Sequence, residues 1–241
     1  MIAERANLSP EIIHEHALGE AIALAKKFPD AKGFLIIDLD DVRDDTKAGF
    51  VRVANWILGR KHPEMRSQLP SVDDVMQGGL RRTYERLIPF AYYKQIWEAV
   101  EQRGNFFRRL PLVDPDLPAH LEVLQAEGFI PIMWLTARDV SQTDISREAG
   151  VARGLRDLPV YAEAPADNNA VAMKIQVLEQ LVAILDKPMI MIDDNAHLIT
   201  ALDAHPDDRM IGVLYPTPPF ADVPARRIAT WPEVLGILQE G

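Results

Sequence analysis

The sequence predicts an α/β fold, a three-layer αβα arrangement in which helices cover both faces of a Rossmann-like, doubly wound parallel sheet. Short apolar runs recur along the 241 residues, and segments with helical periodicity separate them. The runs are continuously apolar rather than alternating, which is typical of strands covered on both faces and therefore of a parallel sheet. One long interval, between Asp41 and Pro118, has no strand pattern. Because it is too long for a crossover, it predicts an inserted α-helical subdomain.

The first predicted element is a helix that begins at Ser9-Pro10, where a capping serine precedes a proline at the first helical position, and that ends before Pro29. The apolar stretch "GFLII", residues 33–37, is the first predicted strand. Four later apolar runs predict the remaining strands: 129–135, 158–162, 188–192 and 210–215. Helical patterns lie between and after these runs: 118–127, 141–153, 168–185, 196–204 and 231–239.

The interval after the first strand contains further helical patterns: 44–58, 72–77, 80–87 and 90–103. Gly78-Gly79 and a short "IPF" stretch separate them, and the proline-rich "LPLVDPDLP" leads back to the next strand. We therefore expect three parts in the chain: an N-terminal helical extension at 1–32, a core at 33–42 and 113–241, and a helical insert at 43–112.

Composition and charge exclude several classes of protein. The net charge of -10 argues against nonspecific nucleic-acid binding, which needs a basic surface. The absence of cysteine rules out disulfides, thiolate metal sites and cysteine nucleophiles. No apolar run approaches the ~18 residues that span a bilayer, and the charged N-terminus lacks a signal-peptide pattern. We expect a cytoplasmic protein that has no membrane partner and is a monomer or a homodimer.

Polar residues follow three of the predicted strands at the point where each strand ends. The first strand leads into Asp38 and Asp40, the second ends at Thr136, and the fourth ends in Asp193-Asp194. Lys174 lies near the start of the helix that precedes the fourth strand. Because ligands bind beyond the carboxyl ends of parallel strands, we expect these side chains to meet at one edge of the sheet. Carboxylates gathered in this way suit a hard, oxygen-binding cation such as Mg²⁺.

Each acidic pair, considered alone, could simply cap the helix that follows it. Asp44 and Asp45 are predicted to be solvated acids in the first turn of the insert's first helix, although Asp45 could also touch a substrate. Asn195 is expected to cap the helix at 196–204. The joint occurrence of the polar residues at strand ends and at a helix start favours a functional site over capping alone.

Four segments resemble, in order, the motifs of the haloacid dehalogenase superfamily of phosphohydrolases. They are "FLIIDLDDV", "IMWLTAR", "NNAVAMKIQVLEQL" with Lys174, and "MIMIDDN". The resemblance extends from about Gly33 onward, and the insert is similar to the helical cap of one large branch. Asp41 stands where glycine is frequent in the family, and Val42 stands where threonine is frequent. Asp40 is present, and dehalogenase-like members lack it, so the chain resembles a phosphatase.

The resemblance implies a Mg²⁺-dependent phosphatase that acts on a small phosphorylated metabolite or nucleotide. Asp38 would attack phosphorus and form an aspartyl-phosphate, and Asp40 would serve as general acid and base. The implied catalytic residues are Asp38, Asp40, Lys174 and Thr136. The implied substrate-binding residues are Thr136, Ala137, Arg138, Lys174 and Asp45. The implied metal ligands are Asp38, Asp194, Asp193 and Asp40, the last through its backbone carbonyl.

Several alternatives stay open at this point. The layout of residues 105–139 is similar to that of nucleoside-monophosphate phosphatases, which favours a 5'-nucleotidase-like activity. A sugar-phosphate or phosphoglycolate-like substrate, a phosphotransferase and a catalytically silent binding protein of the same fold are the alternatives. A signalling receiver uses similar residues, but there the acidic pair comes first in the chain, whereas here it comes last. That order argues against a receiver.

Overall fold

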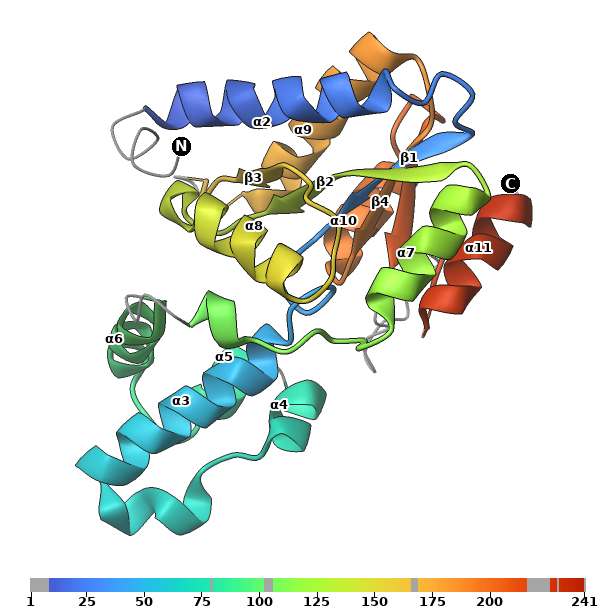
Figure 1. Ribbon diagram of the computed structural model, residues 1–241. Coiled ribbons are helices and arrows are strands. Elements are labelled where there is room, and N and C mark those ends of the chain that lie inside the picture. Colours follow the sequence, from blue (N-terminus) through green and yellow to red (C-terminus); the bar gives the residue numbers. More distant parts are fainter. Residues whose placement is uncertain are drawn as a thin grey trace. The chain divides into compact units, whose positions relative to one another are not determined.

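The computed structural model describes residues 9–78, 80–101, 106–165, 169–215, 226–228 and 230–240. Contacts within the chain divide it into two compact units. The core unit comprises Met1–Arg43 and Asp114–Gly241, and the insert unit comprises Asp44–Val113. Figure 1 shows that the core unit contains the sheet and that the insert unit is helical.

The core unit is built on a five-stranded sheet in which every neighbouring pair is parallel. The strand order is β3-β2-β1-β4-β5, which confirms the predicted doubly wound α/β class. The strands are β1 (Gly33–Ile37), β2 (Phe129–Thr136), β3 (Val160–Ala162), β4 (Met189–Asp193) and β5 (Met210–Leu214). β3 is shorter than the predicted run at 158–162. The register of β1 against β2 shifts after Leu35 pairs with Pro131, a residue that has no N–H to donate.

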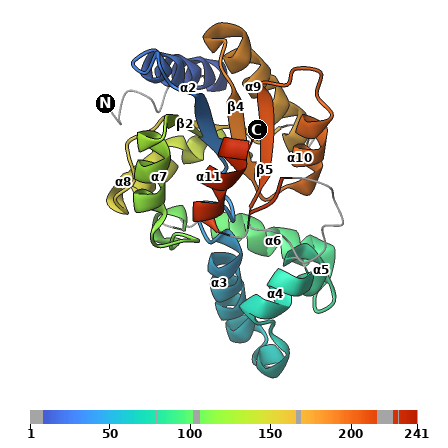
Figure 2. The ribbon, with the colours of Figure 1, turned by 90° about the vertical axis from the view of Figure 1, so that its right-hand side faces the viewer.

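Six α-helices of the described residues cover the two faces of this sheet (Figure 2). α2, α9 and α10 contribute side chains to the main apolar core on one face. On the other face α7 packs against β2, α8 against β3, and α11 against α7. The helices are α2 (Pro10–Ala25), α7 (Leu117–Ala126), α8 (Thr143–Ala152), α9 (Ala170–Leu185), α10 (Ala196–Asp203) and α11 (Trp231–Glu240). A short 3-10 helix, η3 (Val140–Gln142), precedes α8.

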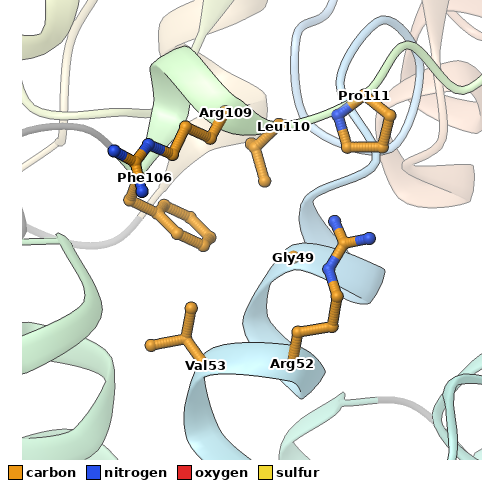
Figure 3. Close-up of a pocket in the computed structure, with 7 residues that line it drawn as sticks. All are labelled: Gly49, Arg52, Val53, Phe106, Arg109, Leu110 and Pro111. Carbon is orange, nitrogen blue, oxygen red and sulfur yellow. The ribbon is translucent and has the colours of Figure 1, made fainter.

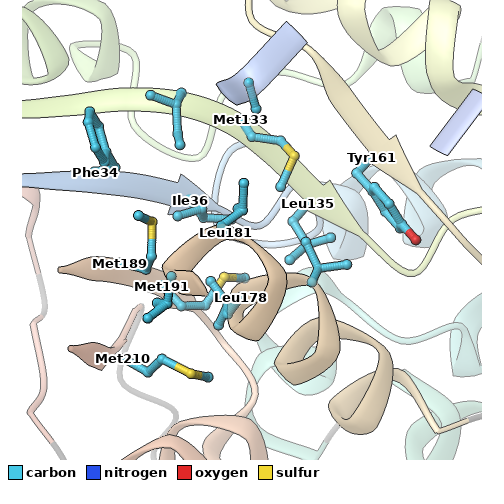
Figure 4. Close-up of a cluster of buried hydrophobic side chains, with 14 of the residues drawn as sticks. Phe34, Ile36, Met133, Leu135, Tyr161, Leu178, Leu181, Met189, Met191 and Met210 are labelled. Carbon is cyan, nitrogen blue, oxygen red and sulfur yellow. The ribbon is translucent and has the colours of Figure 1, made fainter. Parts of the chain in front are cut away.

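The apolar core consists of aliphatic residues and methionines from strands and helices (Figure 4). α9 presents Leu178 and Leu181 to it, and β4 contributes Met189 and Met191, which are fully buried as expected of core residues. A continuous apolar strand is needed at β4 because helices cover the sheet on both sides. Pairing of β1 with β4 places the carboxyl ends of the two strands side by side.

The N-terminal helix α2 belongs to the core unit. It buries a row of small residues, Ala17, Ala21 and Ala25, in the apolar core. His14 stacks on Tyr161 with ring centroids 4.6 Å apart, and its Nε2 lies 3.0 Å from the carbonyl oxygen of Ala162. The helix begins where the sequence predicts, but the Ser9 side chain makes no capping hydrogen bond, which corrects the expected cap.

The insert unit contains α3 (Thr46–Lys61), η1 (Pro63–Gln68), α4 (Val72–Gly78), α5 (Leu80–Glu85), α6 (Phe90–Glu101) and η2 (Phe107–Arg109). Aromatic rings make up much of its interior. Phe50 stacks on Trp97 with centroids 4.7 Å apart, and the buried Tyr84 donates a hydrogen bond to Asn55 Oδ1 at 2.8 Å. The sequence pattern did not predict η1, which begins at Pro63, with one residue between it and the end of α3. Within the described ranges, no helix of either unit is long and apolar enough to cross a membrane.

Candidate active site

The carboxyl ends of β1 and β4 lie side by side at the point where the strand order reverses, and the acidic residues follow these two strands. The Asp38 backbone N–H donates to the carbonyl oxygen of Ile192 at 3.0 Å, which fastens the end of β1 to β4. The Asp38 side chain is buried, with a residue exposure of 4%. A carboxylate at this depth loses most of its hydration and therefore needs a positive partner.

Lys174 supplies that partner from the first turns of α9. Its buried Nζ donates to Asp38 Oδ1 at 2.7 Å and to Asp193 Oδ2 at 2.6 Å. Burial alone would lower the pKa of Lys174, but the charges of Asp193 and Asp38 outweigh burial and raise that pKa above its usual value. The ammonium is therefore protonated, and it bridges the two strand ends. Lys187, by contrast, precedes β4 and lies at the opposite end of that strand.

Asp38 remains difficult to ionise even beside this lysine. Burial raises the pKa of Asp38 well above its usual value, and nearby carboxylates, Asp193 first among them, raise it further. Lys174 opposes the rise without cancelling it. A second cation at this position would favour the ionised form of Asp38, because opposite charges at close range stabilise the charged state.

The structure offers such a cation a set of oxygen ligands. Among the described residues, one cluster of potential metal ligands is found, formed by Asp38, Asp193 and Asp194; one carboxylate oxygen from each residue lies within 4.8 Å of the other two. Carboxylate oxygens are the donors preferred by hard cations such as Mg²⁺. Asn195 caps α10, as predicted, by accepting from the N–H groups of His197 and Leu198 at 3.0 and 3.3 Å. Asp193 and Asp194 are therefore not needed as caps of that helix.

Asp40 occupies a different place from Asp38. Arg138 Nε donates to both Asp40 carboxylate oxygens, at 3.0 and 3.1 Å, and Nη2 donates to Oδ1 at 2.6 Å. Thr136 Oγ1 donates to Asp40 Oδ2 at 3.2 Å. The fork geometry of the guanidinium fixes both the position and the plane of this carboxylate. The structure therefore brings the predicted site residues Asp40, Thr136 and Arg138 together. The ion pair between Arg138 and Asp40 was not predicted from the sequence.

Arg138 is held in turn by the interior of the core unit. Its side chain is only 3% exposed, and Nη1 donates to the hydroxyl of Ser146 on α8 at 3.0 Å. Arg138 therefore forms an ion pair with Asp40 in which the guanidinium is buried and the carboxylate, 32% exposed, is half-buried. Ser146 was missed by the sequence analysis. No local pattern marks it, since it meets Arg138 only through the packing of α8 on the sheet.

The remaining predicted site residues lie elsewhere or make simpler contacts. Ala137 is an exposed residue directly after β2. Asp45 belongs to the insert unit, where it caps α3 by accepting from the Ala48 N–H at 3.0 Å. Asp44 is fully buried, which corrects the prediction that it is a solvated acid. The cap role of Asp45 accounts for its position without a substrate.

The backbone of the turn after β1 accounts for the aspartate at position 41, where the resemblance predicts a glycine more often. Asp41 has a φ of 60°, in the left-handed region that favours glycine. Aspartate tolerates this region better than most residues do, which is why it can stand where glycine is frequent.

Two residues later, the buried Arg43 lies over the Trp134 ring at 5.1 Å. A Cβ at Gly150 would come within 3.0 Å of Arg43 Nη1, so a glycine suits that position.

Comparison with known proteins identifies the fold. No family model and no curated protein sequence matches this chain. A predicted phosphoglycolate phosphatase from Haemophilus somnus matches with a TM-score of 0.56 at 16% identity, over 85% of this chain and 96% of that one. The HAD-hydrolase YfnB from Bacillus subtilis, solved bound to magnesium, matches with a TM-score of 0.53 at 14% identity, over 87% and 100%. Protein Tyrosine Kinase A from Mycobacterium tuberculosis matches with a TM-score of 0.56 at 17% identity, over 87% and 99%.

These likenesses extend over most of each chain, although the sequences have diverged widely. The chain has the fold of the haloacid dehalogenase superfamily, which confirms the fold resemblance inferred from the four motifs. What the site does chemically follows from its own residues.

Proposed function

We propose that this protein is a phosphatase that hydrolyses a small phosphomonoester through an aspartyl-phosphate on Asp38. The observation that carries the proposal is the buried ion-pair bridge from Lys174 to Asp38 and Asp193, set beside a third carboxylate, Asp194. A structural role alone does not call for such a concentration of buried charge, because burying ions is costly and replacing them with apolar residues is often neutral or stabilising. Perturbed carboxylates at a strand-end edge are typical of catalytic sites.

Mg²⁺ is the proposed cofactor, and Asp38, Asp193 and Asp194 are the proposed side-chain ligands. The set of oxygen donors fits this ion, and YfnB, which has the same fold, was solved with magnesium. When bound, Mg²⁺ offsets the repulsion between the anionic substrate and the carboxylates and polarises the phosphoryl group. The raised pKa of Asp38, caused first by burial, supports the need for this second cation.

In the first proposed step a carboxylate oxygen of Asp38 attacks phosphorus. A bond forms between that oxygen and phosphorus while the bond from phosphorus to the ester oxygen breaks. Asp40 donates a proton to the departing oxygen, so the alcohol leaves neutral. Lys174 stabilises the negative charge that gathers on the phosphoryl oxygens. To act as an acid, Asp40 must leave part of its hydrogen-bonded contact with Arg138.

In the second proposed step water attacks the aspartyl-phosphate. Asp40, now ionised, removes a proton from the water as the bond from phosphorus to Asp38 breaks, releasing phosphate and the free carboxylate. Arg138 suits this half of the reaction, because its guanidinium orients the Asp40 carboxylate and favours the ionised form. Thr136 and the backbone at Ala137 are the proposed contacts for the phosphoryl oxygens.

The class of substrate is proposed from the insert unit and from the proteins of similar fold. The insert unit is proposed to act as the cap that selects the substrate, a role described for mobile elements around many active sites. Among the proteins of the same fold, one is a predicted phosphoglycolate phosphatase, which favours a small organic phosphate over the 5'-nucleotidase activity suggested by residues 105–139. Asp45 as a substrate contact, the cytoplasmic location and a monomeric or dimeric state stay predictions.

A phosphotransferase is the second candidate function. Protein Tyrosine Kinase A has the same fold, and an aspartyl-phosphate can pass its phosphoryl group to an alcohol as well as to water. The two reactions differ only in what attacks the intermediate. Product analysis in the presence of added alcohols separates them.

The first experiment measures release of p-nitrophenol from p-nitrophenyl phosphate by wild type, Asp38→Asn and the control Asp208→Asn, each with MgCl₂ or with EDTA. Asp208 is an exposed aspartate of the core unit. We expect Mg²⁺-dependent release by wild type and Asp208→Asn and loss of at least about 10³-fold in Asp38→Asn, because the covalent route is removed. Folded wild type that releases nothing and fails to capture beryllofluoride at Asp38 would contradict the proposal and favour a silent binding protein.

A further inference from the structure

The insert unit contains a cavity that is lined by residues of that unit. Its volume is about 440 Å³, within the range of small-molecule sites. The cavity is lined by residues of α3 and of the segment before the return to the core unit: Gly49, Arg52, Val53, Phe106, Arg109, Leu110 and Pro111. All seven belong to the insert unit. The cavity is therefore a property of that unit alone.

The lining of the cavity combines apolar side chains, which we call the floor and which are those of Phe106 and Leu110, with two arginine side chains. Figure 3 shows Arg109 and Arg52 on opposite sides of the space, with the side chains of Phe106 and Leu110 between them. In the described part of the chain neither arginine has a carboxylate partner, and no acidic residue lines the cavity. In a chain whose net charge is -10, two arginines without acidic partners around one cavity are an uneven distribution of charge.

The position of Phe106 and Leu110 against α3 depends on Gly49. A Cβ at Gly49 would collide with Leu110 Cδ2 and lie 3.3 Å from Phe106 Cε2. Glycine on α3 therefore lets Leu110 and Phe106 lie close against the helix, between the two arginines. The result is a short apolar surface with a strong hydrogen-bond donor at either side. Guanidinium groups bind carboxylates and phosphates through paired N–H donors.

We infer that the insert unit binds a small organic dianion that has an apolar body and an anionic group at each end. The apolar body lies over Phe106 and Leu110, and the two anionic groups meet Arg52 and Arg109. The inference rests on this unit alone and does not depend on phosphatase activity in the core unit. The shared chemistry of the recognised groups is that of carboxylate and phosphate.

The experiment is calorimetric titration of the full chain, treated with EDTA in phosphate-free buffer, with 2,6-naphthalenedicarboxylate as probe. The comparison probes are 2-naphthoate, which has one carboxylate, and 2-naphthalenemethanol, which has none. We expect one binding site, with affinity falling about fivefold or more at each loss of a carboxylate, as charge-assisted contacts at a partly exposed site imply. A parallel titration with 2,6-naphthalene bisphosphate tests phosphate as the end group.

The variants Arg52→Gln and Arg109→Gln assign the contacts. Each should reduce the affinity for the dicarboxylate to about that of the monocarboxylate, and the double variant should bind all the naphthalene probes alike. Arg82→Gln is the matched control, because Arg82 is an exposed arginine of the same unit that does not line the cavity. Asp38→Asn should bind as wild type does. Equal affinity of wild type for the charged and neutral probes, or unchanged binding in both cavity variants, would overturn the inference.

Discussion

Replacing Lys174 by methionine should destabilise the core unit in the absence of metal. Methionine keeps much of the side-chain volume of lysine but removes the ammonium that contacts Asp38 at 2.7 Å and Asp193 at 2.6 Å. All three side chains are buried. The substitution therefore leaves two carboxylates close together without their cation, and one of them must take up a proton or remain as an uncompensated charge.

The expected loss can be estimated from these contacts. Removing one partner of a buried ion pair costs about 3–5 kcal/mol, a large share of the ~5–15 kcal/mol that stabilises a typical domain. For a unit of this size, about 2–4 °C of melting temperature corresponds to each kcal/mol, so the fall should be about 6–20 °C. Lys187→Met is the matched control. Lys187 is a half-buried lysine at the other end of β4, and the control should lower the melting temperature by less than about 2 °C.

The assay is thermal unfolding followed by circular dichroism, first with EDTA and then with excess MgCl₂. Because a divalent cation offsets the same carboxylates, Mg²⁺ should restore part of the loss in Lys174→Met. Bound at a hundredfold excess over its dissociation constant, an ion adds about 2.7 kcal/mol to folding stability. A Lys174→Met protein that melts with the Lys187→Met control in EDTA would refute the view that Lys174 compensates buried charge.

The same pair of proteins has a defined pH dependence. The pKa of Asp38 is raised in the folded state, first by burial, so its contribution to stability is present at low pH and is lost as the pH rises through the folded pKa. Removing Lys174 removes the charge that opposes this rise. The difference in melting temperature between wild type and Lys174→Met should therefore be smallest at low pH, where Asp38 is protonated in both proteins, and should grow as the pH rises. A difference that shrinks as the pH rises would contradict this sign.

Two further substitutions test other contacts. Arg138→Gln should lower kcat for p-nitrophenyl phosphate about 10–100-fold with little change in KM, because Arg138 positions Asp40. A raised KM at unchanged kcat would instead show that Arg138 contacts the substrate, as the resemblance implies. Gly49→Ala should destabilise the insert unit by about 1–3 kcal/mol in urea unfolding, because the new methyl group collides with Leu110. Gly59→Ala, on the same helix, is the control. A Cβ there meets no atom closer than 3.5 Å, so this variant should be neutral or slightly stabilising. Equal losses of stability in the two variants would show that the collision with Leu110 has no cost of its own.

The sequence by itself determined the class of fold and the order of its motifs. Continuous apolar runs such as 33–37 and 188–192 identify strands buried on both faces, and that pattern depends only on local composition. Since parallel strands place their carboxyl ends at one edge, the expectation that Asp38 and Asp193 share that edge followed from the sequence pattern. Lys174 was expected at the same edge because it lies near the start of the helix that precedes the fourth strand.

Only the tertiary structure decided how these residues are paired. The contact of Arg138 with Asp40 joins residues 98 positions apart, and the support from Ser146 depends on how α8 packs, so no local pattern could reveal either. The burial of Asp44 was mispredicted because two adjacent acids look alike in a sequence, whereas burial depends on distant segments. The cavity between Arg52 and Arg109 likewise depends on the return segment passing close to Gly49. Strand identity is a property of neighbours along the chain, but pairing and enclosure are properties of neighbours in space.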